Sequence, residues 1–232
     1  LAFVKVKEKR SYKSVLMEKY IRMSGMKKPF ENVEDAKKAL QETKEITAGK
    51  YEGTDYEFKH DVKTKSWNGS VTYVVNAQRN RQQKVVLYIH GGAWFQDPLD
   101  EHFEFIDQLA GQLDARIIMP IYPKVPHRDY RTTFELLKSI YEKQLTEVES
   151  SDQLIIMGDS AGGQIALSFA EYLNEATQLQ QPGHIVMLSP VLDGTLSNPD
   201  AKEYEKIDPM LGIDGSKYLS LIHISEPTRP RL

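Results

Sequence analysis

The stretch of sequence best suited to chemistry is Gly158-Asp159-Ser160-Ala161-Gly162-Gly163, a G-x-S-x-G pattern. It lies between an apolar run predicted to be a buried strand and a helical pattern that begins near Ala161. So tight a turn holds the serine in a strained backbone conformation and leaves its hydroxyl exposed. The helix N-terminus adds unpaired amides and a positive dipole, which stabilise an oxyanion. We predict Ser160 to be a nucleophile; the alternative is a glycine-rich turn that only joins strand to helix.

A second glycine turn, His90-Gly91-Gly92-Ala93-Trp94, follows an earlier apolar run at residues 85–89. Consecutive glycines allow backbone amides to point into a cleft without obstruction. Strand ends in a parallel sheet share one edge, so this turn is expected beside Ser160. The amides of Gly91, Gly92 and Ala161 are therefore the predicted oxyanion hole.

Two side chains of the second turn have more than one interpretation. His90 could act as a general base, but a histidine beside such a loop is expected to order the loop by hydrogen bonding. Trp94 could pack within the loop or contact the acyl group of a substrate, and the sequence leaves both readings open.

These turns require a sheet that positions them, and the pattern of apolar residues predicts one. Strand-like runs at 85–89, 115–119, 154–157 and 185–188 alternate with helical patterns. This alternation predicts an α/β fold with a parallel sheet covered by helices on both faces. Further upstream, runs at 56–62 and 71–75 flank Asn68-Gly69 and suggest an antiparallel hairpin, which makes the sheet mixed.

The N-terminal region has a different character. Residues 8–45 are rich in Glu and Lys, with apolar residues at helical spacing on both sides of Pro29, which predicts two amphipathic helices. They could pack on the surface or form a lid over a site. The expected organisation is a helical cap region at residues 1–50, an incomplete core at 51–219 and a non-native tail at 220–232.

With both turns in view, the sequence resembles the hormone-sensitive-lipase-like carboxylesterases of the α/β-hydrolase fold. Two further segments agree with that family: Tyr122-Pro123-Lys124-Val125-Pro126 is similar to its Tyr-x-x-x-Pro segment, and Leu188-Ser189-Pro190-Val191-Leu192-Asp193 to its Leu-Ser-Pro segment. The resemblance extends from about residue 56 to residue 214.

The resemblance implies hydrolysis of small-molecule carboxylic esters with short or medium acyl chains, through an acyl-enzyme on Ser160. It implies no metal and no organic cofactor, and it implies that residues upstream of the sheet form a cap. A peptidase or amidase on the same fold is the first alternative, because amide cleavage uses the same serine and oxyanion donors. A ligand-binding protein without catalysis is the second.

One part of the family pattern is absent. The resemblance places an acid roughly 90 and a histidine roughly 120 residues after the serine, whereas this chain ends at Leu232. We therefore expect a C-terminally truncated member. His223 lies in the tail, which resembles adaptor sequence, and is not expected to be the base. Without a base the Ser160 hydroxyl stays protonated, so the chain as written is expected to be inactive or nearly so.

Other acids and bases are given structural roles. Asp193, Asp208 and Asp214 come before the expected position of the acid, and Asp159 is expected to stabilise the turn. His184 opens a strand and is also expected to be structural.

Composition narrows the class of protein. A net charge of −3 gives no electrostatic reason to expect nucleic acid or stable membrane association. The absence of cysteine excludes disulfides, a thiolate nucleophile and cysteine-bound metal, and fits a cytoplasmic protein. No signal peptide or membrane span is visible in the sequence, and the oligomeric state is not indicated.

Overall fold

The apolar runs predicted as buried strands form the parallel part of a six-stranded sheet. The structure is a computed structural model that describes residues 10–222, and its strand order is β1-β2-β4-β3-β5-β6. The parallel strands are β3 (Val85–Ile89), β4 (Arg116–Pro120), β5 (Leu154–Asp159) and β6 (His184–Leu188). All five residues of β3 are buried, as a continuous apolar run predicts for a central strand. The predicted mixed α/β fold is confirmed.

The predicted hairpin is also present, but its first strand lies elsewhere. β1 (Val62–Trp67) pairs antiparallel with β2 (Ser70–Val75), and β2 pairs antiparallel with β4. The turn is Asn68-Gly69, and both residues have positive φ (46° and 81°), as a two-residue type I′ turn requires. The expectation of a first strand at 56–62 is wrong.

The segment before β1 does not pair as a strand because a buried carboxylate binds its backbone. The amides of Lys59 and His60 donate hydrogen bonds to Asp107 at 2.8 and 3.2 Å. Tyr56 and Phe58 meet edge to face at 5.0 Å and pack against the core. The apolar alternation of residues 56–62 thus serves packing of an extended loop.

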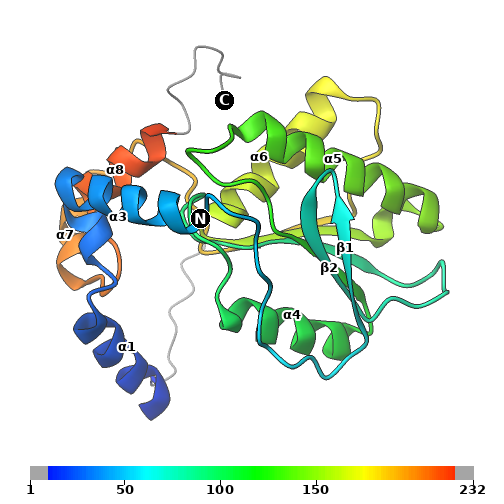
Figure 1. Ribbon diagram of the computed structural model, residues 1–232, viewed down its shortest axis with the longest axis horizontal. Helices are drawn as coiled ribbons and strands as arrows, with labels where there is room; N and C mark the ends of the chain where they lie inside the picture. The colour runs from blue at the N-terminus through cyan, green and yellow to red at the C-terminus, as the bar shows by residue number, and fades with distance from the viewer. Residues whose placement is uncertain (1–9, 223–232) are drawn as a thin grey trace. The chain divides into compact units, whose positions relative to one another are not determined.

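Helices cover both faces of the sheet (Figure 1). α4 (Asp100–Leu113) covers one face, where its Phe103 and Ile106 pack with Val86 and Tyr88 of β3. α5 (Tyr130–Glu147) and α6 (Ala161–Ala176) cover the other face. A short 3-10 helix, η1 (Ser151–Gln153), precedes β5. The alternation of side chains along β3 therefore provides core contacts on both faces.

Residues 41–193 form the unit that contains the sheet, and residues 194–221 pack instead with the N-terminal helices in a second, helical unit. The helices of this region are α1 (Tyr12–Ser24), α2 (Lys28–Glu31), α3 (Val33–Ile46), α7 (Ala201–Ile207) and α8 (Ile213–Ile222). The two predicted N-terminal helices are confirmed as α1 and α3. Pro29 lies in the first turn of α2, where proline is tolerated.

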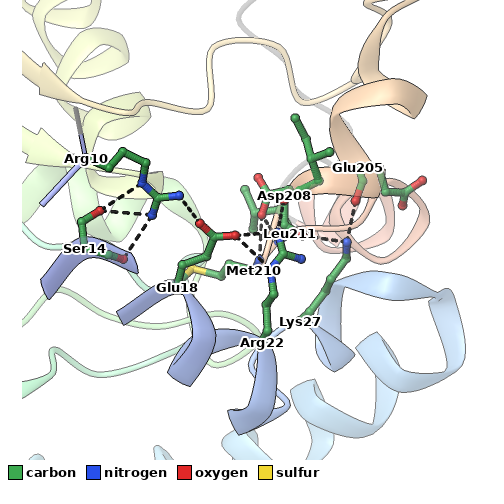
Figure 2. A network of polar contacts seen from close by, with 10 residues as sticks. Arg10, Ser14, Glu18, Arg22, Lys27, Glu205, Asp208, Met210 and Leu211 are labelled. Atoms are coloured by element: carbon green, nitrogen blue, oxygen red, sulfur yellow. Dashed lines mark hydrogen bonds and ion pairs between the residues drawn. The ribbon is translucent and has the colours of Figure 1, made fainter. Parts of the chain in front are cut away.

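Polar contacts join the two sequence-distant parts of the helical unit (Figure 2). Glu18 pairs with Arg10 and with Arg22, and Arg22 donates to the carbonyl oxygen of Ile207 at 2.5 Å. Lys27 donates to the carbonyl oxygens of Glu205 and Asp208 at 2.6 and 2.9 Å. Because these acceptors are backbone atoms around the end of α7, the contacts hold that turn against the N-terminal helices.

At the C-terminal end, α8 continues to Ile222, three residues into the segment expected to be a non-native tail. The rest of that segment, with His223, lies outside the described residues. Within residues 10–222, no helix is long and apolar enough to cross a membrane.

Candidate active site

Ser160 lies in the turn between β5 and α6 with a strained backbone. Its φ of 50° and ψ of −119° fall outside the regions that residues with a side chain normally occupy. Its carbonyl oxygen accepts from the amides of Gly163 and Gln164 at 3.1 and 3.2 Å, which begins the helix, and the residue stays partly exposed. The turn thus has the strain and exposure that the G-x-S-x-G pattern predicted.

The glycines around Ser160 are required by close backbone contacts. A Cβ on Gly158 would lie 2.3 Å from the carbonyl oxygen of Gly162. A Cβ on Gly162 would lie 2.0 Å from the carbonyl oxygen of Ile89 and 2.7 Å from that of His90. Since both clashes are with backbone, no side-chain movement could relieve them.

The segment after β6 also holds the serine turn. The Ser160 amide donates to the carbonyl oxygen of Leu188 at 2.9 Å, and the Val191 amide lies 3.4 Å from the carbonyl oxygen of Ser160. Pro190 lies against Gly163, where a Cβ would meet the proline ring at 3.0 Å. Only the family resemblance drew attention to this Leu-Ser-Pro segment, because its residues have no chemical signature of their own.

Both glycine turns leave the same edge of the sheet. β3 and β5 are adjacent and parallel, and their register pairs Ile89 with Gly158. The second turn therefore begins at His90 beside Asp159, directly before the serine, as the sequence predicted.

Asp159 connects the two turns. Its Oδ1 accepts from the Tyr88 hydroxyl at 2.6 Å and from the Gly91 amide at 2.9 Å. Its Oδ2 lies 3.4 Å from Nε2 of His102. Burial opposes ionisation of this carboxyl, but the hydrogen bonds from His102, Tyr88 and Gly91 outweigh burial and lower the pKa of Asp159. Asp159 is thus a charged side chain that links the two turns by hydrogen bonds.

The hydrogen bond from the Gly91 amide to Asp159 changes the expected role of Gly91. The sequence predicts that its amide points into the cleft as an oxyanion donor, but in the structure that N–H donates to Asp159. An amide hydrogen bound by a carboxylate is not available to a substrate oxygen. Gly92 has a φ of 109°, and a Cβ there would lie 3.0 Å from the Gln96 carbonyl oxygen, so glycine is required. Ala161 is the first residue of α6, where a helix leaves the amide without an intrahelical partner.

His90 is completely buried beneath its own loop. Its Nδ1 lies 2.6 Å from the Gly91 carbonyl oxygen, its Nε2 lies 3.3 Å from Nζ of Lys124, and its ring stacks on Tyr122 at 4.4 Å. Burial, followed by the Lys124 charge, holds the pKa of His90 well below its usual range. With both ring nitrogens engaged, this neutral histidine orders the loop and is not placed to act as a base.

Trp94 is also buried, with 7% of its surface exposed and a φ of 68°. Its ring meets Tyr122 edge to face at 6.2 Å. The sequence allowed two roles for Trp94, and these contacts correspond to packing within the loop.

The remaining histidines within residues 10–222 have no hydrogen bond to Ser160. They contact other groups: His60 binds Asp107, His102 binds Asp159 and the Leu99 amide, and His127 binds Thr47 and the Lys44 carbonyl. His184 pairs with Ile155, near the start of β5 and so at the opposite end of that strand from the serine. Among the described residues, no imidazole is therefore hydrogen-bonded to Ser160, the predicted nucleophile.

A cavity of about 160 Å³ lies away from these turns. Its walls come from the hairpin, β4 and the end of α5: Lys63, Lys65, Trp67, Val74, Ala77, Arg116, Ile118, Lys143, Gln144 and Glu147. None of the predicted site residues is among them, and the site is identified by backbone geometry rather than by a cavity.

Comparison with known proteins agrees with this geometry. A family model described as alpha/beta hydrolase fold matches residues 86–228. An esterase of Acinetobacter venetianus is 29% identical over 140 residues, which is 60% of this chain and 46% of the relative. An ethyl acetate hydrolase of Pseudomonas putida is 25% identical over 195 residues, 79% of this chain and 60% of the relative.

Solved structures give the same result. The crystal structure of a proposed esterase from Staphylococcus aureus superposes with a TM-score of 0.78 and 26% identity, covering 88% of this chain and 69% of that one. The chain spans about half the length of the curated relatives that it matches. The predicted resemblance to hormone-sensitive-lipase-like esterases is confirmed, and the chain belongs to the α/β-hydrolase fold family.

Proposed function

We propose that Ser160 is the nucleophile of a serine esterase that cleaves carboxylic esters with short or medium acyl chains. The observation that carries this proposal is the strained backbone of Ser160 at the junction of β5 and α6. Strained backbone conformations cluster at active sites, and strain in a turn from a strand to a helix is characteristic of a nucleophile elbow. The name of the Pseudomonas putida relative, an ethyl acetate hydrolase, supports a short ester as substrate.

In this proposal, Oγ of Ser160 attacks the ester carbonyl carbon and forms a tetrahedral intermediate. The amides of Gly92 and Ala161 donate to the oxyanion, while Gly91 contributes by binding Asp159. Collapse of the intermediate breaks the bond to the alkoxy group, which leaves as the alcohol with the proton that Ser160 has lost. Water then hydrolyses the acyl-enzyme to the acid and regenerates Ser160. Trp94 is kept as a candidate contact for the acyl group. Residues 1–50 are kept as a candidate cap.

The proton of Ser160 needs an acceptor, and this limits the activity of the chain. Within residues 10–222, no histidine is hydrogen-bonded to Ser160, so the hydroxyl stays protonated at neutral pH. Oxyanion donors alone leave residual catalysis on the order of 10³-fold over water in well-studied triads. We therefore propose that this 232-residue chain hydrolyses esters slowly or not at all.

Two measurements test the proposal. Prolonged incubation with a fluorophosphonate, followed by peptide mapping, should place the label on Ser160 in preference to other serines. Ser160→Ala should lose the label, and Ser189→Ala, in the neighbouring turn, should keep it. Labelling spread equally over surface serines would exclude Ser160 as the nucleophile and would favour a ligand-binding protein.

The second measurement is turnover of p-nitrophenyl acetate beside that of a peptide anilide. We expect hydrolysis of the ester close to the rate of the Ser160→Ala protein, and none of the anilide. Ordinary enzymatic turnover that depends on Ser160 would contradict the proposed lack of a base, while preference for the anilide would favour the amidase alternative.

A further inference from the structure

A buried lysine without a role in the proposed chemistry lies behind the His90 loop. Lys124 is 6% exposed, and its Nζ donates to the Tyr122 carbonyl oxygen at 2.8 Å. The same Nζ lies 3.3 Å from Nε2 of His90 and 3.4 Å from Oδ1 of Asp97. An ammonium has three protons and no acceptor, so these three acceptors use all of its donors. A buried charge persists only when it is paired in this way.

The lysine and the Gly91 carbonyl oxygen both require the proton of His90 to be on Nδ1. Because an ammonium can only donate, Nε2 of His90 must be the unprotonated nitrogen. In the neutral ring the hydrogen is then on Nδ1, which donates to the Gly91 carbonyl oxygen at 2.6 Å. The low pKa of His90 is consistent with this neutral tautomer.

The His90 hydrogen bond in turn orients the next amide. In a trans peptide the C=O and N–H point in opposite directions. With the Gly91 carbonyl oxygen held by the His90 ring, the Gly92 N–H points away from that ring. The preceding peptide is fixed at both ends, since the Tyr122 hydroxyl donates to the His90 carbonyl oxygen at 2.9 Å and the Gly91 amide donates to Asp159.

We propose that Lys124 is a positioning residue that aims the Gly92 amide by stabilising, together with the Gly91 carbonyl oxygen, one tautomer of His90. The significance of Gly92 rests on the proposed function, in which its amide donates to an oxyanion. The contacts that run from Lys124 through His90 to Gly91 do not depend on that function. No step of proton transfer involves Lys124.

The charge of Lys124 makes this positioning dependent on pH. Burial lowers the pKa of Lys124 to about 8, against the opposing effect of Asp97. All three partners of Nζ are acceptors, so loss of one proton leaves one of them without a donor. The other titratable groups facing this cluster are Tyr122, His102, whose ring lies 5.8 Å from that of His90, and Asp159. Two of them have pKa values displaced away from neutrality, Tyr122 upward and Asp159 downward.

Nitrogen-15 NMR of the full chain tests the proposal directly. In the unaltered protein, His90 should show one tautomer, with hydrogen on Nδ1. Lys124→Met keeps most of the length of the side chain and removes its donors, so that only the Gly91 carbonyl oxygen still favours hydrogen on Nδ1. We expect a second His90 tautomer to become populated and the Gly92 amide signal to shift. Lys138→Met, which removes a partly exposed lysine paired with Glu142, is the matched control and should change neither signal.

If Lys124→Met does not fold, a pH titration of the unaltered chain gives the same test. The His90 Nε2 signal and the Gly92 amide signal should shift together, with a midpoint near pH 8. An unchanged tautomer and Gly92 signal in folded Lys124→Met, or no common midpoint in the titration, would overturn the proposal. Ser160→Ala should leave both signals intact, so failure of the proposed esterase function is distinguished from failure of this positioning.

Discussion

At the scale of single residues, the candidate site depends on glycines at positions where a Cβ atom would not fit. The carbonyl oxygens of Ile89 and His90 occupy the volume that a Cβ on Gly162 would need. This close approach brings the start of α6 against the end of β3, and so brings the two turns together. The glycines of the pattern are therefore packing requirements of the site.

Gly162→Ala should destabilise the protein by more than about 2 kcal/mol, because overpacking against a rigid backbone has no side-chain relief. The matched change is Gly49→Ala, at an exposed glycine where a Cβ would meet nothing within 4 Å. That change should alter stability by less than about 1 kcal/mol. Urea unfolding of both variants measures the difference. Equal stabilities would show that the turn relaxes around the added carbon.

A second prediction concerns Lys124 and alkaline pH. Its pKa is about 8 in the folded chain and near 10.5 when unfolded, so between these values the unfolded state binds more protons. The free energy of unfolding should therefore gain a contribution that rises with pH, by up to about 1.4 kcal/mol per pH unit. Comparison should stop near pH 9.5, before the buried tyrosines contribute in the opposite sense.

The measurement is urea unfolding between pH 7.5 and 9.5 for the unaltered chain and Lys124→Met. The rising contribution should be absent from the variant, and Lys138→Met should retain it. Parallel curves for all three proteins would mean that Lys124 keeps an ordinary pKa in its buried site.

The sequence predicted the turn at Ser160 better than the surroundings of that turn. Ser160 and the glycine pair were predictable because a short pattern of small residues implies a definite backbone shape. The binding of Gly91 to Asp159 and the contact between Lys124 and His90 were not, because their partners lie 68 and 34 residues apart in the chain. Such contacts depend on the register between strands, which a short segment of sequence does not predict.

At the scale of elements, strand prediction succeeded where the strand is a continuous apolar run and failed at β1, which is mostly polar. The central strands were found because buried parallel strands are continuously apolar. β1 was misplaced because its residues are mostly exposed and polar, with no apolar alternation to reveal it. Residues 56–61 showed an alternation, but Asp107 binds their backbone amides. The grouping of residues 194–221 with the N-terminal helices had no sequence signal.

Asp107 should therefore anchor the segment before β1. Its carboxylate is almost fully buried and accepts from the Tyr56 hydroxyl, two backbone amides and the His60 ring. Asp107→Ala should destabilise the protein by roughly 3 kcal/mol, since four partly buried donors lose their acceptor. Limited proteolysis should then cut within residues 52–61.

The control lies on the same helix. Glu104→Ala removes an exposed carboxylate of α4 and should change stability by less than about 0.5 kcal/mol, without new cleavage. Resistance of Asp107→Ala to cleavage would mean that the aromatic contacts of Tyr56 and Phe58 hold the segment by themselves.

At the scale of the whole molecule, the two edges of the sheet differ in a way that affects solubility. β1, at one edge, carries Lys63 and Lys65, and charged side chains of this kind discourage pairing between sheets. In the part of the chain that the structure describes, β6 is the other edge. Its Ile185 and Val186 are 38% and 37% exposed. An apolar strand with an unpaired backbone is a template for association.

We therefore expect this 232-residue chain to self-associate through β6 as its concentration rises. Ile185→Lys should lower the association constant about tenfold or more, because pairing two such edges would bring like charges together and bury them. Thr64→Lys, which adds the same charge to exposed β1, should leave association unchanged. Sedimentation velocity over a concentration series separates the two. Equal association of all three proteins would place the contact on a surface other than β6. Only Ile185→Lys adds a charge to the edge strand whose backbone groups are expected to pair.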